Sequence, residues 1–302
     1  MAKRIINFEA EKEKGIKEMI TEFIDFKITQ GCSQLTMKNY NSTFRWFEDY
    51  DFDFMELLKT KSDASPAKFN VPYSCINAFY NWCVLQEYIL KNPLLKSGLK
   101  KIRDDGNIRV VNIPNIQKLL SVIDLNTYVG LRDKAIIMIM LDSGVRPKEI
   151  FGLTIEDFTG DTLIIQKKVA KTRQLRVVPV SKIVSTQIKK IIALKPCEWS
   201  NNYIFCSYDG LQMHVEMFDK RLKKYSKDAD VNIKPYDLRH SFATMYLNNN
   251  GNVFSLQKIM GHSDLRMTKR YIAITDEQLV EQHKTNSPIN NILRKNMRID
   301  KI

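Results

Sequence analysis

Apolar side chains recur three and four residues apart in the N-terminal third of the chain, a pattern typical of helices that bury one face. The first such stripe contains Ile16, Met19, Ile20, Phe23 and Ile24. Gly31 should end this helix, and Ser33 or Thr36 could cap the next one. The next stripe contains Met37, Tyr40, Phe44 and Phe47. The pattern therefore predicts helices that pack on one another.

A polar break at residues 59–66 separates these helices from a third, which the pattern places after Pro72. Its stripe contains Ile76, Phe79, Tyr80, Cys83 and Val84, and it should end before Asn92 and Pro93. Because the aromatic residues stand at core spacing, they favour a packed interior over a platform for stacked bases. We expect a small helical domain.

Residues 96–112 are basic and polar and contain two glycines, which indicates a linker between domains. We place the boundary near Asp105, so that the helical domain covers residues 1–105. The basic side chains of the linker could follow a phosphate backbone or could serve only to keep it solvated. Helical spacing resumes after Pro114.

The second part of the chain mixes helical stripes with one β-branched pair of segments. Helices are expected at 116–123, 133–142 and 181–194, and another around Met217, Leu222 and Tyr225. Residues 162–165 and 176–180 are rich in Val and Ile and are joined by a basic turn, which predicts a β-hairpin. Beyond a break at Ser287 and Pro288, a final apolar stripe contains Ile289, Ile292, Leu293 and Met297.

The charge of the chain narrows the class of partner. Its 302 residues include 47 Lys and Arg against 34 Asp and Glu, a net charge of +13. Such an excess indicates a polyanion, of which nucleic acid is the usual one. The sequence carries no lipidation signal or cationic anchor for a membrane, and its five scattered cysteines form neither a disulfide framework nor a zinc motif. We expect a cytoplasmic protein.

The rarest chemistry of the chain is gathered between Pro235 and Tyr271. Arg239 is followed 23 positions later by His262, and Tyr271 comes 9 positions after that. A tyrosine hydroxyl can attack a phosphodiester if cationic donors neutralise the charge that develops on the phosphate oxygens. Arginine suits this role because its planar guanidinium stays charged. Each residue alone would more often be a core or surface residue, so their spacing carries the argument.

This spacing resembles the second catalytic box of the tyrosine recombinases, the phage-integrase family. The resemblance implies an all-α core-binding domain followed by a mixed α+β catalytic domain with a small antiparallel hairpin. The catalytic domain would cover residues 106–285, and a C-terminal tail residues 286–302. In that family the tail docks on a neighbouring protomer, although here it could also pack on its own domain.

The resemblance extends to further site residues. Arg146, after the turn at Gly144, is similar to the family's first phosphate-binding arginine, and Glu149 to the acidic residue that supports the site. Lys171, in the loop of the expected hairpin, stands where the family has its catalytic lysine. His240 follows Arg239 and is a supporting candidate.

The chain departs from the family pattern at one position. The family commonly has a histidine three residues before its second arginine, and this chain has Tyr236. A phenol can still donate a hydrogen bond to a phosphate oxygen, but it is a poor base at neutral pH. The departure leaves open how protons move during the reaction.

The resemblance implies a site-specific recombinase that cuts and rejoins double-stranded DNA through a 3′-phosphotyrosyl intermediate. It implies no cofactor and no metal, a site of inverted repeats that binds two protomers, and a tetramer when two sites pair. Two alternatives remain. A type IB topoisomerase would share the chemistry but relax DNA as a monomer, and a non-catalytic DNA-binding regulator would not need the five residues Arg146, Lys171, Arg239, His262 and Tyr271.

Overall fold

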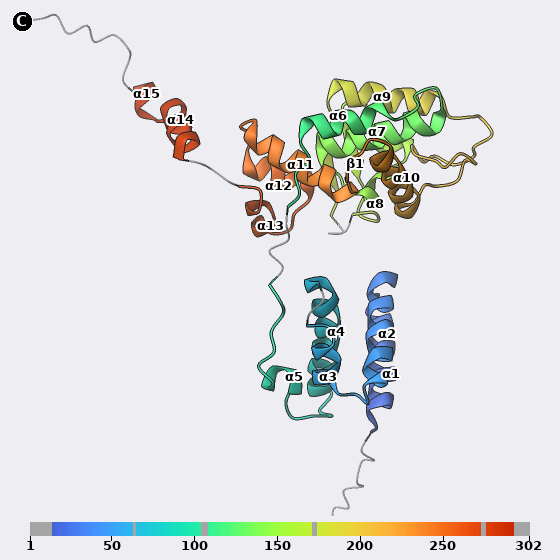
Figure 1. Ribbon diagram of the computed structural model, residues 1–302, viewed down its shortest axis with the longest axis vertical. Coiled ribbons are helices and arrows are strands. Elements are labelled where there is room, and N and C mark those ends of the chain that lie inside the picture. Colours follow the sequence, from blue (N-terminus) through green and yellow to red (C-terminus); the bar gives the residue numbers. More distant parts are fainter. Residues whose placement is uncertain (1–13, 63–64, 104–107, 171–173, 273–275, 293–302) are drawn as a thin grey trace, which may run out of the picture. The chain divides into compact units, whose positions relative to one another are not determined.

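The protein is described by a computed structural model that covers residues 14–62, 65–103, 108–170, 174–272 and 276–292. The chain divides into two compact units, residues 1–106 and 107–302 (Figure 1). This division lies next to the boundary expected at residue 105. The assignment of the first unit to core binding and of the second to catalysis stays a prediction at this point.

The first unit is helical and has an aromatic core. It contains α1 (Ile16–Thr29), α2 (Gln34–Asp49), α3 (Phe54–Lys59), α4 (Pro66–Leu85) and α5 (Pro93–Lys96), of which α1, α2 and α4 contact one another (Figure 1). Phe23 is fully buried and packs edge-to-face on four other rings. These rings are Tyr40, Phe44, Phe79 and Trp82. The aromatic stripes are therefore core, as the sequence indicated.

Two details of this unit differ from the sequence analysis. The third expected helix begins at Pro66 rather than after Pro72, so Pro72 lies inside α4. Proline is favoured at the first helical position because it needs no partner for an N–H and its φ is already helical. The interior proline costs one backbone hydrogen bond, and the burial of Pro72 and Tyr73 offsets it. The short helix α3, which follows the Asp53 cap, was not expected.

The expected linker is held at both ends. On the first unit, the Tyr73 hydroxyl donates to the Leu99 carbonyl, and Asn70 exchanges two hydrogen bonds with the backbone of Ile102. On the second unit, the Val111 N–H donates to the Ser241 hydroxyl. Leu99 and Ile102 are thus held by the first unit and Val111 by the second.

The second unit combines helices with a two-stranded sheet. Its elements are α6 (Ile113–Ser121), α7 (Tyr128–Ser143), α8 (Pro147–Ile150), the 3₁₀ helix η1 (Ile155–Asp157), β1 (Thr162–Ile165), β2 (Arg176–Pro179), α9 (Lys182–Ala193), α10 (Val215–Asp228), α11 (Pro235–Asn248), α12 (Val253–Met260) and α13 (Leu265–Lys269). The helix α7 contacts both α9 and α11, and β2 contacts α12. This mixture of helices with a small antiparallel sheet confirms the expected fold class.

The two strands of the hairpin pair so that alternate residues of each strand face the core. Strands β1 and β2 are antiparallel, and Leu163 pairs with Val178. On β2, Val178 and Arg176 face inward while Val177 is exposed. An arginine therefore occupies an inward position in a strand, and its partners decide its role.

The buried helix α7 is fixed at both ends. Near its start, Asp133 accepts hydrogen bonds from Arg132, Arg221 and Tyr225. At its end, Gly144 adopts φ 59°, the left-handed conformation that favours glycine. A Cβ there would lie 2.4 Å from a ring carbon of Phe242 on α11, so only glycine lets α7 and α11 approach this closely.

The C-terminal part of the chain contains α14 (Asp276–Asn286) and α15 (Ile289–Ile292). Ser287 and Pro288 separate the two helices, as the sequence predicted. Leu293 and Met297 of the expected apolar stripe lie outside the described residues. Among the helices that the structure describes, none has the length and apolar character needed to cross a membrane.

Candidate active site

In the first half of the site, two arginines form hydrogen bonds with one carboxylate. Glu149 of α8 accepts two hydrogen bonds from the Arg176 guanidinium, at 3.1 and 2.6 Å, and one from the Arg146 side chain at 3.2 Å. The Arg146 backbone N–H also donates to Glu149, at 3.1 Å. Burial alone would raise the pKa of Glu149, but the two arginines outweigh it and lower the pKa. Glu149 is therefore ionised and orients both guanidinium groups.

The second arginine of the expected site, Arg239, projects from α11 and is 3% exposed. Its guanidinium donates to the carbonyl oxygens of Gly144 and Met260 and lies 3.1 Å from the Nε2 atom of His262. All of these partners are neutral. Burial and the positive charge of Arg146 lower the pKa of Arg239 to about 9, so the group is still cationic at neutral pH.

Two left-handed glycines supply backbone carbonyls to the arginines. The Gly144 carbonyl, at the end of α7, accepts from Arg239. The Gly261 carbonyl, at the end of α12, accepts from Arg146 at 3.3 Å. Gly261 adopts φ 61°, and a Cβ there would lie 3.0 Å from the Arg176 guanidinium. The turns that end two helices thus form part of the site, because the last carbonyls of a helix lack partners within it.

His262 forms a hydrogen bond with Arg239 in this structure. An arginine cannot accept a hydrogen bond, so the Nε2 atom of His262 must accept from Arg239. The proton then resides on Nδ1, which lies 2.8 Å from the Thr268 hydroxyl of α13 and donates to it. Burial and the charges of the surrounding arginines lower the pKa of His262 to about 3. The imidazole is therefore neutral, with both nitrogens engaged.

Tyr271 lies two residues after the end of α13 and is buried against two histidines. Its hydroxyl is 2.7 Å from the Nδ1 atom of His240 on α11. Its ring lies nearly parallel to that of His262, with an interplanar angle of 9° and centroids 6.4 Å apart. Burial raises the pKa of Tyr271, although the charges of Arg239, Arg270 and Arg146 act against that rise. The phenol is therefore protonated at neutral pH.

The charge of the site is the property that most restricts its ligand. Three buried guanidinium groups, those of Arg146, Arg176 and Arg239, lie in the site, and only the first two pair with the carboxylate of Glu149. Within the described residues, Arg239 uses three of its five N–H groups and Arg146 uses two. The remaining donors and the excess positive charge suit a planar or tetrahedral anion such as a phosphate.

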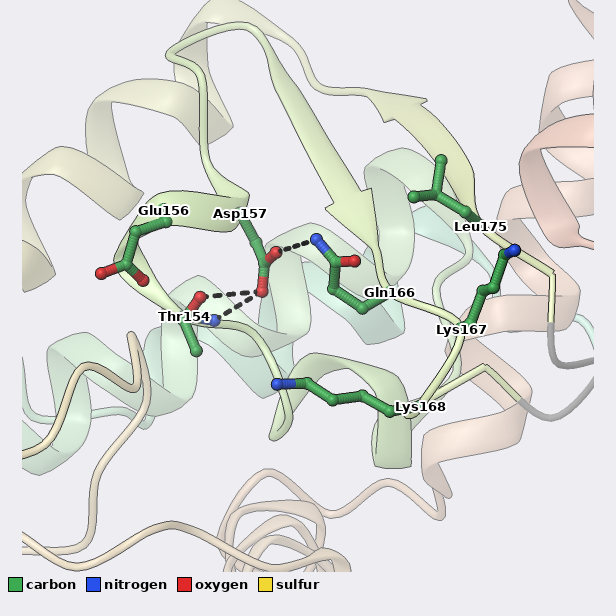
Figure 2. A pocket seen from close by; sticks show the side chains of 7 residues that line it. All are labelled: Thr154, Glu156, Asp157, Gln166, Lys167, Lys168 and Leu175. Atoms are coloured by element: carbon green, nitrogen blue, oxygen red, sulfur yellow. Dashed lines mark hydrogen bonds between the residues drawn. The ribbon is translucent and has the colours of Figure 1, made fainter.

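Two expected residues are not placed at this centre. Tyr236, on the first turn of α11, is 54% exposed, and its ring centroid lies 6.5 Å from that of His240. Lys171 lies outside the described residues. The base of its loop is fixed, because Gln166 donates to Asp157 at 2.7 Å and Asp157 also accepts from Thr154 (Figure 2). Figure 2 also shows Lys168 extending toward Thr154 and Lys167 extending toward Leu175.

Sequence reasoning missed two members of the site. Arg176 was read only as the first residue of a strand, although it is buried and carries the stronger pairing with Glu149. A charged residue at an inward position of an apolar strand was the available signal. Thr268, which orients His262, gave no signal in the sequence. Among the described residues, no group of His, Cys, Asp and Glu could hold a metal ion.

Comparison with known proteins places this geometry in a class. The model of the phage integrase family matches residues 110–278. The tyrosine recombinase XerD of Listeria monocytogenes serotype 4b is 26% identical over 90% of this chain and 99% of its own. The tyrosine recombinase XerA of Pyrococcus horikoshii is 26% identical over 87% of this chain and 92% of its own.

Solved structures agree in fold. The integrase of transposon Tn1549, in complex with a circular intermediate DNA, has a TM-score of 0.69 at 21% identity and covers 88% of this chain and 99% of its own. The XerH recombinase bound to its difH substrate has a TM-score of 0.65 at 18% identity and covers 88% of this chain and 82% of its own. The chain therefore belongs to the phage integrase family and is a tyrosine-type site-specific DNA recombinase. These relatives do not favour the topoisomerase or the non-catalytic regulator.

Proposed function

We propose that Tyr271 is the nucleophile, and that it attacks the scissile phosphate to give a 3′-phosphotyrosyl link and a free 5′ hydroxyl. The observation that carries this proposal is the burial of Tyr271 near the buried guanidinium groups of Arg239 and Arg146, of which Arg146 is held by Glu149. Because charge builds on the phosphate oxygens in the transition state, donors fixed in advance stabilise it more than flexible ones do.

The roles of the other side chains follow from their contacts. Arg146 and Arg239 bind the non-bridging oxygens with those N–H groups that make no hydrogen bond to the protein among the described residues. Glu149 and Arg176 keep Arg146 in place. His262 donates to the phosphate only after its Nε2 atom releases Arg239 and takes up a proton, because Nε2 accepts in the described state.

Lys171 is the proposed acid for the departing 5′ oxygen. It belongs to the loop between β1 and β2, whose ends at Gln166 and Arg176 are both anchored. An ammonium group near other cations has a lowered pKa and gives up its proton more readily. The energy of the broken phosphodiester is kept in the tyrosyl link, so rejoining needs neither ATP nor a metal.

We further propose that the chain acts as a dimer on each DNA site and as a tetramer when two sites pair. Related structures support DNA as the partner, since XerH is bound to its difH substrate and the Tn1549 integrase to a circular intermediate DNA. A dimer with two-fold symmetry reads inverted repeats, which should be about ten base pairs on either side of a short spacer.

Two steps test this function. Selection of bound duplexes from a random pool identifies the site, and two copies of it are then placed on one supercoiled plasmid. A recombinase converts the plasmid into products whose form depends on the relative orientation of the two sites. Relaxation of supercoils with no such products would instead indicate a topoisomerase, and binding without any strand breakage would indicate a regulator.

A further inference from the structure

The hydroxyl of the proposed nucleophile has one specific contact that its role as a nucleophile does not by itself require. Among the described residues, the hydrogen bond to Tyr271 is made by the Nδ1 atom of His240, at 2.7 Å. The two rings are 5.6 Å apart and tilted by 39°, which brings the imidazole edge to the hydroxyl. His240 is half-buried on α11, directly after Arg239. The contact joins α11 to the segment that follows α13.

A protonated tyrosine must lose its proton when its oxygen bonds to phosphorus. The charged groups near Tyr271 cannot take this proton, since arginine has no acceptor. These groups are Arg146, Arg239 and Arg270. His262 is also excluded in the described state, because its two nitrogens bond Arg239 and Thr268. Among the described residues, this leaves His240 as the acceptor within reach.

Tyr236 cannot replace it. Tyr236 lies one helical turn before His240 on the same side of α11, but its ring centroid is 6.5 Å from that of His240 and it is exposed to solvent. A phenol is also a weak base at neutral pH. The position where the family commonly has a histidine is therefore unsuited to accept the proton here, whereas His240 is in contact with the nucleophile.

The charge state of His240 suits the role. The groups that act on it are Arg239 and Asp237 on its own helix, Arg270 and Tyr271 on the facing segment, and His262 of the adjoining turn. Burial lowers the pKa of His240 from its ordinary value of 6.5, and the charges of Arg239 and Arg270 lower it further. The imidazole is therefore neutral at pH 7, with Nδ1 free to accept the Tyr271 proton when Nε2 carries the hydrogen.

We infer that His240 is the general base of the reaction, and that its Nδ1 atom takes the Tyr271 proton as the phenolic oxygen attacks the phosphate. This inference rests on the proposed function. The oxygen of Tyr271 bonds to phosphorus, the bond from phosphorus to the 5′ oxygen breaks, and Lys171 protonates that oxygen. During rejoining, Lys171 takes the proton of the attacking 5′ hydroxyl, and the His240 imidazolium returns its proton to Tyr271. Two proton carriers thus serve the two oxygens, and no proton is gained or lost in a full cycle.

The competing interpretation is that the hydrogen bond between His240 and Tyr271 only holds the tyrosine in place in the free protein (a storage contact) and breaks when DNA binds. The two interpretations predict opposite effects on cleavage. Loss of a general base slows proton removal by about 100-fold or more. Loss of a storage contact leaves cleavage unchanged or makes it faster, because Tyr271 is then released more easily.

The test measures the rate of covalent adduct formation at Tyr271 on a suicide duplex, with the full chain and two variants. His240→Asn can keep an oxygen near the position of Nδ1 but does not take up a proton, and His240→Ala opens space for added imidazole. A second duplex carries sulfur in place of the scissile 5′ oxygen. A thiolate leaves without a proton, so this duplex removes the need for Lys171 and isolates the chemistry of Tyr271.

We expect both variants to form the adduct about 100-fold more slowly on both duplexes, and Lys171→Ala to be restored by the sulfur duplex. Added imidazole should accelerate His240→Ala but not His240→Asn. The wild-type rate should fall with decreasing pH only below pH 6.5, where His240 becomes protonated, whereas the His240→Asn rate should keep rising above pH 7.

Rapid cleavage by His240→Asn would overturn the inference in favour of a storage contact. Slow cleavage with a wild-type pH profile and no response to imidazole would reduce His240 to a positioning residue, and would also overturn it. Binding of the duplex by each variant, measured by gel shift, checks that the fold is intact. If the wild-type chain forms no adduct at Tyr271, the proposed function itself fails and this inference falls with it.

Discussion

Arg239 has only neutral hydrogen-bond partners among the described residues although it is 3% exposed. A buried charge without a counter-ion costs free energy, and protein folds keep such a charge where a ligand supplies the compensation. A phosphodiester bound between Arg239 and Arg146 would supply one negative charge, shared by two non-bridging oxygens, at this point. The burial of Arg239 among neutral partners therefore favours binding of the DNA backbone at this point.

The departure at Tyr236 can be tested by substitution. Tyr236 is exposed, and its ring lies beside that of His240, so we expect its hydroxyl to contribute at most a single hydrogen bond to the phosphate. We expect Tyr236→Phe to slow cleavage by less than about tenfold and Tyr236→His to be tolerated, when adduct formation is followed on a suicide duplex. Arg239→Ala serves as the reference for complete loss. A defect of that size in Tyr236→Phe would show that the phenol moves a proton.

At the scale of elements, one ion pair joins three of them. Glu149 of α8 pairs with Arg176 of β2, and Arg176 also donates to the Ile259 carbonyl of α12 at 3.0 Å. The hairpin and the turn that carries His262 are thus fixed relative to Arg146. This explains why the distances within the site depend on residues that never touch the substrate.

This junction predicts a specific dependence of stability on pH. Glu149→Gln leaves two buried guanidinium groups without their carboxylate and should lower the free energy of unfolding by about 3 kcal/mol at pH 7. The pKa of Glu149 is lowered on folding, so its contribution is present above the ordinary value of 4.5 and is lost as the pH falls further. The difference between the two proteins should therefore narrow at acid pH.

Calorimetry of the second unit's transition in the full chain measures this difference. Glu198→Gln is the matched control, because Glu198 is exposed in the same unit. We expect the control to melt within about 0.5 kcal/mol of the wild type at every pH. A Glu149→Gln deficit that stays constant down to pH 3 would mean that the carboxylate is not held ionised by its arginines.

Several elements of the second unit could be predicted from the sequence because their signals are local, although α7 begins at Tyr128 rather than at residue 133, and η1, α12 and α13 were not predicted. Gly144 marks the end of α7 and Pro147 begins α8, while β-branched runs mark β1 and β2. The predicted start of α4 was wrong because both Pro66 and Pro72 are possible first residues of a helix. Only the burial of Phe69 and Tyr73 in the folded unit favours the start at Pro66.

The site was predictable to the extent that its residues form motifs. Spacing singled out Arg239, His262 and Tyr271, and the structure brings these three together. Spacing carries no information on the contact between Arg176 and Glu149 or between His240 and Tyr271, since each depends on how separate elements pack. The sequence did not predict the hydrogen bonds of His262 with Arg239 and Thr268 for the same reason.

At the scale of the whole molecule, the tail beyond Pro288 is the candidate for assembly. Ile289 and Ile292 of α15 are more than half exposed, and a helix this short is unstable alone in water. We expect removal of residues 287–302 to leave binding to a half-site intact and to weaken cooperative binding to a full site. Burial of three or four apolar side chains contributes on the order of 5 kcal/mol, largely offset by ordering.

Gel-shift titration of the truncated chain on half-sites and full sites measures this effect. The matched control replaces Ile289 and Ile292 by Ser in the full-length chain, which removes the apolar side chains but keeps the segment. If the truncated chain filled both half-sites as cooperatively as the full-length chain, the tail would pack on its own domain, and docking between protomers would be ruled out.

The most direct test of the central claim is to identify the residue that becomes joined to DNA. A suicide duplex traps the covalent intermediate, and mass spectrometry of its proteolytic peptides locates the nucleotide. We predict a 3′-phosphate attached to Tyr271 in the wild-type chain, and no adduct in Tyr271→Phe, which should still bind the duplex. An adduct on Tyr236 or any other residue, or one that persists in Tyr271→Phe, would contradict the account.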